Sequence, residues 1–119
     1  MTVDSGRIQG ELAVSRALGD FQFKECSNVP HKDQPVSCLP DMKIVERTNQ
    51  DQFMALACDG VFDMFSNNEL AQVIRSNFAE TEDLSVTAER ILDISLNKGS
   101  TDNMTIIIIA FNSLFDYYI

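Results

Sequence analysis

The sequence predicts an α+β fold on the basis of two observations. Residues 52–58 and 104–111 are apolar runs typical of strands, and the stretch between them repeats apolar side chains at helical spacing. The 119 residues are 45% hydrophobic and 23% charged, which is typical of a globular chain of single-domain size. We therefore expect residues 1–119 to lie within one domain or to form part of one.

The first third of the chain has weak local patterns. Residues 7–14, RIQGELAV, suit a short strand or a helix almost equally. Residues 20–40 contain Pro30, Pro35 and Pro40 among Asn, Ser and Asp side chains, so we expect a long irregular connection at the surface.

A β-hairpin is predicted in the middle of the chain. Residues 42–46 alternate in the manner of a short strand, and Asn-Gln-Asp at 49–51 is typical of a turn. Residues 52–58 provide the second strand. We expect the two strands to pair because a short turn joins them.

Two helices are predicted next. Ser66 and Glu69 have the spacing of a capping box, in which the Ser and Glu side chains bind each other's backbone amides at a helix start. The second helix, at 84–98, should end at Gly99, because glycine tolerates the left-handed conformation of a helix cap. The apolar faces comprise Leu70, Val73, Ile74 and Phe78 on the first helix, and Ala88, Ile91, Leu92, Ser95 and Leu96 on the second.

The last predicted strand is MTIIIIAF, at residues 104–111. An edge strand of a two-layer sheet would normally alternate apolar and polar side chains. The nearly continuous apolar run instead predicts a strand that is buried on both faces. Residues 112–119 contain no pattern that predicts an element.

Charge and composition exclude several classes of protein. A net charge of −9, with basic residues scattered singly, repels nucleic-acid phosphates and anionic membranes and attracts divalent cations and basic peptides. Cys26, Cys38 and Cys58 form no CxxC pair and His31 is the only histidine, so we expect neither a disulfide framework nor a zinc site. Without a long apolar run or a signal-peptide pattern, we expect a cytoplasmic or nuclear protein.

Two acidic turns adjoin the predicted strands. Asp59-Gly60 follows residues 52–58, with Asp63 one helical turn later, and Asp102-Asn103 precedes residues 104–111. A carboxylate sheltered beside apolar strands is costly unless it is paired or bound to a cation. Aspartate oxygens suit Mg²⁺, Mn²⁺ and Ca²⁺, and Gly60 would let the backbone approach an ion closely. Taken singly, each pair is more often a turn or a cap than a metal ligand.

Three motifs, taken in order, resemble one protein family. GELAVSRALGD at 10–20, ACDGVFDMFSNNE at 57–69 and GSTDNMTIII at 99–108 resemble successive motifs of the metal-dependent, type 2C protein serine/threonine phosphatases. The stretch at 38–41 is similar to that family too. The resemblance extends over nearly the whole chain up to Phe111 and corresponds to the C-terminal half of the catalytic domain.

This resemblance implies a fold and a chemistry. The family fold is a sandwich of two antiparallel β-sheets flanked by helices, with two Mn²⁺ or Mg²⁺ ions in a cleft at one end. A water or hydroxide that bridges the ions attacks the phosphorus of phosphoserine or phosphothreonine in a protein substrate, and the ions neutralise the charge of the phosphoryl group.

The resemblance also implies roles for individual residues. Asp59 and Asp102 match metal ligands, Asp63 matches part of a third, weaker ion site, and no catalytic residue is expected beyond these ligands. Supporting roles are expected for Gly60 through close backbone approach, for Asn103 by orienting the Asp102 turn, and for Asp20 by capping or binding backbone amides near the site.

The family's remaining motifs are absent from this sequence. Its first metal-bridging aspartate, its Asp-Gly-His-Gly-Gly run and a phosphate-binding arginine belong to an N-terminal half that the sequence does not contain. We therefore expect the isolated chain to be inactive or weakly active, to expose strand edges that favour aggregation, and to have a complementary N-terminal half as a partner. The alternative is a non-catalytic fragment of the same fold that binds phosphoproteins or regulators.

Overall fold

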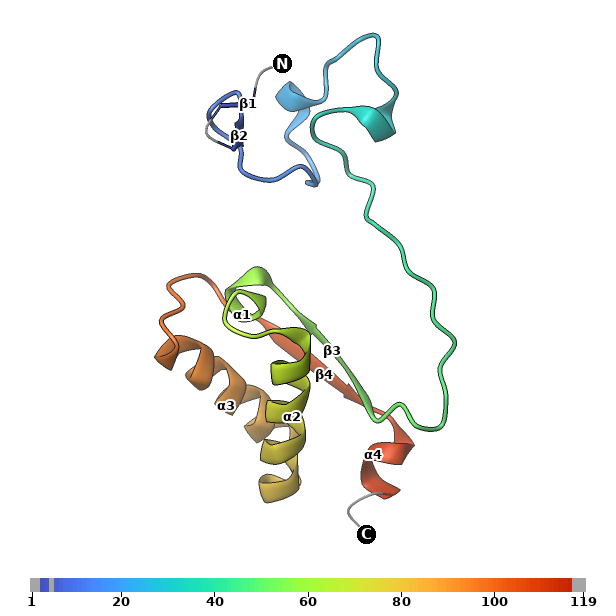
Figure 1. The fold of residues 1–119 in the computed structure, drawn as a ribbon, viewed down its shortest axis with the longest axis vertical. Helices are drawn as coiled ribbons and strands as arrows, with labels where there is room; N and C mark the ends of the chain where they lie inside the picture. The colour runs from blue at the N-terminus through green and yellow to red at the C-terminus, as the bar shows by residue number, and fades with distance from the viewer. Residues whose placement is uncertain (1–2, 5, 117–119) are drawn as a thin grey trace. The chain divides into compact units, whose positions relative to one another are not determined.

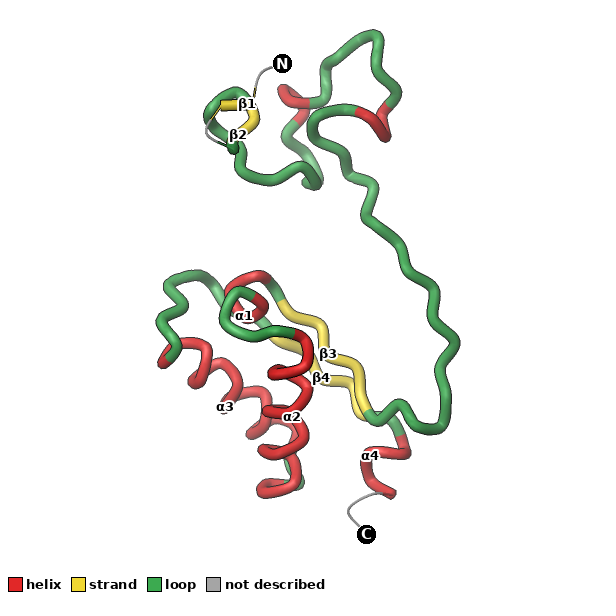
Figure 2. Tube along the Cα trace, in the orientation of Figure 1, coloured by secondary structure: helices red, strands yellow, loops and turns green. Residues whose placement is uncertain are grey.

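The computed structural model describes residues 3–4 and 6–116. The chain divides into two units, Met1–Val45 and Glu46–Ile119, and each is described by itself. Loops make up most of the N-terminal unit, whereas helices and strands make up most of the C-terminal unit (Figure 2).

The C-terminal unit contains a two-stranded antiparallel sheet with helices packed on one face (Figure 1). The sheet pairs β3 (Phe53–Ala57) with β4 (Ile106–Ala110), in a register that places Phe53 opposite Ala110 and Ala57 opposite Ile106. Between the strands in sequence lie α1 (Asp59–Phe62), α2 (Asn67–Thr81) and α3 (Leu84–Asn97). A short helix that no sequence pattern indicated, α4 (Asn112–Asp116), follows β4, and residues 117–119 lie outside the described chain.

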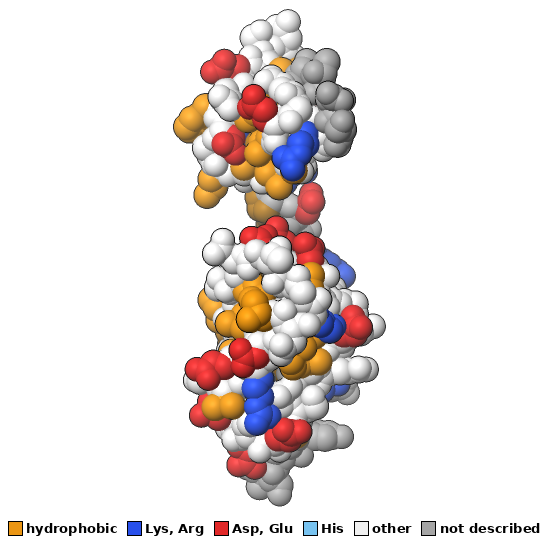
Figure 3. Space-filling model, turned by 90° about the vertical axis from the view of Figure 1, so that its left-hand side faces the viewer, with side chains coloured by type: hydrophobic (Ala, Val, Ile, Leu, Met, Phe, Trp, Pro, Cys, Tyr) orange, Lys and Arg blue, Asp and Glu red, His pale blue; other side chains and the backbone are white. Residues whose placement is uncertain are grey.

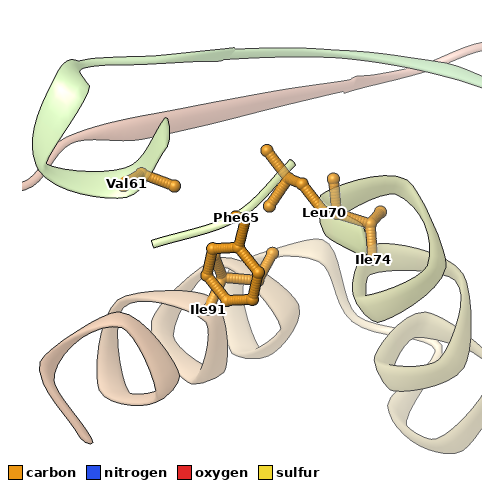
Figure 4. Packing of buried hydrophobic residues seen from close by; sticks show 5 residues of the cluster. All are labelled: Val61, Phe65, Leu70, Ile74 and Ile91. Atoms are coloured by element: carbon orange, nitrogen blue, oxygen red, sulfur yellow. The ribbon is translucent and has the colours of Figure 1, made fainter. Parts of the chain in front are cut away.

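The core of this unit lies between the helices and the sheet. Its buried side chains come from α1, α2, α3 and the loop after α1: Val61, Phe65, Leu70, Ile74 and Ile91 (Figure 4). Alternate strand residues pack against this cluster and define the covered face of the sheet: Phe53, Ala55, Ala57, Ile106 and Ile108. Full burial of one large apolar side chain contributes about 1.5–3 kcal/mol, so this cluster is a main source of stability.

The helix boundaries follow the predicted capping residues. The Ser66 hydroxyl accepts a hydrogen bond from the Glu69 amide at 3.3 Å, and the Glu69 carboxylate accepts one from the Ser66 amide at 2.8 Å. The capping box is therefore confirmed. Helix α3 begins after Asp83, whose carboxylate caps the Ser85 amide, and Gly99 follows it with a φ of +97°. The predicted end of the second helix is confirmed as well.

Apolar side chains line both faces of the sheet, but the described helices pack on only one. Met54, Leu56, Ile107 and Ile109 form the opposite, bare face and are between 41% and 56% exposed. The prediction that residues 104–111 are buried on both faces is therefore wrong within the C-terminal unit. Leu96, which is 59% exposed, also departs from its predicted place on the buried side of α3.

The predicted pairing of residues 42–46 with 52–58 is wrong, because residues 42–46 form no strand and β3 pairs with β4 alone among the described residues. Residues 41–48 have no regular secondary structure, although the predicted turn is present and the Asp51 amide donates to the Thr48 carbonyl at 3.2 Å. Four consecutive isoleucines make β4 a strong strand former, and its register places Ile106 and Ile108 against the core. Burial of these side chains stabilises the pairing of β4 with β3, whereas Met42, Ile44 and Val45 are 71% to 91% exposed and gain no such burial.

The N-terminal unit begins with two very short strands. β1 (Val3–Asp4) pairs antiparallel with β2 (Arg7–Ile8), and a single bridge links Ile8 to Leu12. Residues 7–14 therefore form neither a continuous strand nor a helix.

The irregular connection predicted at 20–40 is confirmed. It contains only two 3₁₀ helices among the described residues, η1 (Phe21–Phe23) and η2 (His31–Asp33). The connection also contributes to a small core, because Phe23 and Val36 are buried together with Ile8. It is therefore more than a surface loop.

Candidate metal centre

The two acidic turns lie at the same end of the β3–β4 sheet. Asp59 begins α1 directly after Cys58, and Asp102 lies in the loop before β4. The Cys58 amide donates to the Thr105 carbonyl at 3.2 Å, so antiparallel pairing continues one residue beyond the strands. The end of β3 and the start of β4 therefore bring the two turns close together.

Gly60 brings the backbone of the first turn against the second loop. A Cβ atom at position 60 would collide with the carbonyl oxygen of Asn103 and would lie 3.1 Å from the Cγ atom of Met104. The hydroxyl of Ser100 donates to the Gly60 carbonyl at 2.9 Å. Gly60 thus lets the backbone of its turn come close to the loop that contains Asn103.

Cys58 provides a further link between the same loops. Its thiol donates to the carbonyl oxygen of Asn103 at 3.2 Å, and its sulfur accepts a hydrogen bond from the Thr105 amide at 3.2 Å. A thiol is a weak donor and acceptor, so these contacts chiefly help to fix the packing of the two loops.

The carboxylates of Asp59 and Asp102 have similar local partners. Asp59 Oδ1 accepts from the Gly60 amide at 3.1 Å, and Asp102 Oδ1 accepts from the Asn103 amide at 2.7 Å. Within residues 3–4 and 6–116, neither aspartate forms an ion pair with Lys or Arg. Acidic side chains are also dispersed over the face of the C-terminal unit drawn in Figure 3.

Both aspartates are exposed, so the expectation that they are sheltered beside the strands is wrong. The reason is that each lies in a turn just beyond the end of its strand. Burial therefore does not require a cation at Asp59 or at Asp102. Support for an ion site comes instead from the carboxylate oxygens of the two residues and from the contact between their loops.

Asp63 is the residue that caps the C-terminal end of α1, one turn after Asp59. Its amide donates to the Asp59 carbonyl at 2.7 Å, and its side chain is exposed. The next residue, Met64, is held by Lys98, whose ammonium group donates to the Met64 carbonyl at 2.8 Å and lies 4.0 Å above the Phe65 ring. The backbone around Asp63 is thus attached to the end of α3.

The donor groups fit a hard cation in part. Carboxylate oxygens are the ligands that Mg²⁺ and Mn²⁺ prefer. In the part of the chain that the structure describes, no group of three or more His, Cys, Asp or Glu side chains is arranged to hold an ion. An ion with about six ligands would therefore need water, or residues from outside this chain, beside Asp59 and Asp102.

Asp20 lies in the N-terminal unit, where it precedes η1 in a left-handed conformation with a φ of 49°. Its carbonyl accepts a hydrogen bond from the Phe23 amide at 3.0 Å, but its side chain does not cap η1. The predicted role of Asp20 as a cap is therefore not found at this helix.

Ser100 was not singled out by the sequence patterns, although its side chain joins the two loops. The only local signal is a small polar residue directly after Gly99 at a helix end. Its partner, Gly60, is 40 residues away in sequence, so no spacing rule could have identified the contact.

Comparisons with known proteins agree with the three sequence motifs. The family described as protein phosphatase 2C matches residues 1–104. Protein phosphatase ppm-1.A of Caenorhabditis elegans is 44% identical over 106 residues, which cover 88% of this chain and 23% of that protein. Human protein phosphatase 1A is also 44% identical over 106 residues, covering 88% of this chain and 28% of that protein.

Solved structures share the fold over most of this chain. The crystal structure of a phosphatase from Toxoplasma gondii matches with a TM-score of 0.81 and 31% identity, covering 90% of this chain and 33% of that one. A C. elegans sex determining protein matches with a TM-score of 0.75 and 28% identity, covering 94% of this chain and 26% of that one. The α+β class is confirmed, as a small antiparallel sheet with helices.

These matches show that the chain belongs to the protein phosphatase 2C family. The chain spans only 23% to 28% of the length of the two relatives described above. Within the described residues, no helix combines the length and apolar character needed to cross a membrane.

Proposed function

We propose that this chain supplies part of the metal centre of a phosphatase that hydrolyses phosphoserine and phosphothreonine in proteins. Asp59 and Asp102 are the proposed ligands of a binuclear Mn²⁺ or Mg²⁺ centre, and Asp63 belongs to a third, weaker site. The main support is the contact between the loops of Asp59 and Asp102, because two carboxylates distant in sequence extend from adjoining backbone segments.

The residues of this chain would hold and orient the ligands. The amides of Gly60 and Asn103 each fix one carboxylate oxygen, which leaves the second oxygen of Asp59 and of Asp102 for an ion. When bound, the metal ions would activate a water for attack on phosphorus and would neutralise the charge of the phosphoryl group. No side chain of this chain is proposed as a nucleophile.

The complete domain is proposed to be a two-sheet antiparallel sandwich flanked by helices, with the β3–β4 sheet as part of one layer. The chain spans about a quarter of the length of its relatives. This short span supports a complementary N-terminal half as a partner. That half would supply further metal ligands and would cover the bare face. Phosphorylated proteins are the proposed substrates of the whole assembly.

Mn²⁺ titration of the full 119-residue chain tests the metal role, with paramagnetic broadening of amide NMR signals as the readout. We expect the signals of Asp59, Gly60, Asp102 and Asn103 to broaden first. The double variant Asp59→Asn, Asp102→Asn should lose this selective broadening, because an amide is a much weaker ligand than a carboxylate. Asp93→Asn, which changes an exposed aspartate of α3, should behave as the wild type. Equal broadening in the double variant would contradict the proposal.

The second candidate function is a non-catalytic fragment of the same fold that binds phosphoproteins or regulators. The short span of the chain relative to its relatives favours it for the isolated chain. Incubation with a phosphothreonine peptide and Mn²⁺ separates the two functions. Chelator-sensitive release of phosphate supports the phosphatase, whereas saturable peptide binding without phosphate release supports the alternative.

A further inference from the structure

The carbonyl group of Gly60 accepts no hydrogen bond from an amide of α1. Helix α1 spans only Asp59–Phe62, and the amide of Met64 donates to the Val61 carbonyl at 3.0 Å instead of to Gly60. Carbonyls at helix ends need partners from elsewhere in the protein. Gly60 is buried, and the Ser100 hydroxyl satisfies its carbonyl at 2.9 Å.

Ser100 is itself held by the end of α3. Its amide donates to the Ser95 carbonyl at 3.1 Å, and the Gly99 amide donates to the Leu96 carbonyl at 3.0 Å. The left-handed conformation of Gly99 makes this turn possible. Ser100 is 7% exposed, so its hydroxyl has little access to water. A serine fixed by a helix end therefore fixes the turn that contains Asp59.

Asp102 lies between two points at which the loops touch. On one side, Ser100 bonds to the Gly60 carbonyl, and on the other side the Asn103 carbonyl contacts both Gly60 and the Cys58 thiol. The backbone on either side of Asp102 is therefore attached to the turn of Asp59.

We propose that Ser100 is a positioning residue that holds the Asp59 turn and the Asp102 loop in a fixed relation. It acts through the Gly60 carbonyl and touches no reacting group. Its importance for metal binding rests on the function proposed above, whereas the joining of the two loops does not need a metal and can be measured without one.

The metal-free test compares Ser100→Ala with Ser95→Ala in the full chain. Ser95 is a matched control because it is fully buried and its hydroxyl donates to the Ile91 carbonyl at 2.9 Å within α3. Only its backbone carbonyl contacts Ser100, and Ser95→Ala retains that carbonyl. Loss of one buried hydrogen bond corresponds to roughly fivefold faster local amide exchange. We expect this increase at the Asp63 and Thr105 amides in Ser100→Ala, and no such increase in Ser95→Ala.

A spectroscopic signature accompanies the exchange data. The carbonyl carbon resonance of Gly60 should move upfield in Ser100→Ala, because it loses a hydrogen-bond donor, and should stay in place in Ser95→Ala. Mn²⁺ affinity should fall roughly fivefold in Ser100→Ala even though both carboxylates are retained, and should equal that of the wild type in Ser95→Ala.

Equal exchange at Asp63 and Thr105 in the two variants would overturn the positioning role. Unchanged Mn²⁺ affinity in Ser100→Ala, with binding abolished by Asp59→Asn and Asp102→Asn together, would overturn the importance of Ser100 for metal binding while leaving the metal proposal intact. If the wild type binds no Mn²⁺ but Ser100→Ala shows the selective exchange, the joining role is supported and the metal proposal fails.

A second measurement covers the case in which Ser100→Ala does not fold. Native-state exchange of the wild type at increasing urea concentrations shows which amides open together. The proposal requires the Asp63 and Thr105 amides to open in the same step as the Lys98 amide at the end of α3. Separate opening of these amides at lower urea would overturn it.

Discussion

The covered and bare faces of the β3–β4 sheet are formed by alternate residues of the same two strands, yet their surroundings differ. On the covered face, Ile108 lies opposite Ala55 and packs against the core beneath α2 and α3. On the bare face, Ile107 lies opposite Leu56 and is 56% exposed. Adjacent isoleucines thus have the same chemistry but different burial. An apolar sequence shows that a face is suited to burial, and tertiary contacts decide whether it is buried.

Substitution of adjacent isoleucines gives the largest expected contrast. Threonine keeps the branched shape that strands favour but adds a hydroxyl. Ile108→Thr should lower the free energy of unfolding by about 2 kcal/mol, because the hydroxyl enters an apolar core, whereas Ile107→Thr should change it by less than about 0.5 kcal/mol. Urea denaturation followed by circular dichroism measures both. Equal losses would mean that the two faces are equally buried in solution.

Loss of the α2 cap should have a smaller effect on the free energy of unfolding. The cap matters to the sheet because α2 is one of the helices that cover it. Ser66→Ala should lower the free energy of unfolding by about 1 kcal/mol at pH 7. Hydrogen bonds from the Ser66 hydroxyl and amide, and then the charge of Lys98, lower the pKa of Glu69 in the folded state.

The lowered pKa of Glu69 sets the sign of the pH dependence. The stability gained from this carboxylate is present above the unfolded pKa of Glu, about 4.3, and is lost as pH falls through the lower folded value. The difference between wild type and Ser66→Ala should therefore shrink when unfolding is measured at pH 3 instead of pH 7. A difference that stays constant or grows would show that Glu69 does not take part.

Charges on the bare face should have the smallest effect on stability and a clear effect on solubility. Ile107→Lys with Ile109→Lys places two charges on the exposed apolar face, which should hinder self-association while changing the free energy of unfolding by less than about 1 kcal/mol. Light scattering during a concentration series measures the association. Scattering equal to that of the wild type would show that this face does not drive aggregation.

Features set by local chemistry could be predicted from the sequence. The capping box at Ser66 and Glu69 and the glycine end of α3 depend on residues a few positions apart, and both are present. Pairing between distant strands could not be predicted in the same way. The short loop after Glu46 favoured a local hairpin, whereas the pairing of β4 with β3 depends on burial that the packed helices provide.

The candidate site could be predicted only as a set of residue types. The motifs indicated Asp59, Asp63 and Asp102, and the roles of these residues as metal ligands stay predictions. The exposure of Asp59 and Asp102 could not be inferred, because both adjoin apolar strands in sequence. The bond from Ser100 to Gly60 was also beyond sequence reasoning, since it depends on where α3 ends in space.

The contact between Gly60 and Asn103 has a consequence for the order of folding. The segments that meet there are separated in sequence by α2 and α3, so closing this loop costs chain entropy. We expect α2 and α3 to dock first, because their packing brings the ends of this loop closer together. We expect the end of the sheet with the aspartates to form late, because the Asp59 turn finds its partners only after residues 100–104 have been synthesised.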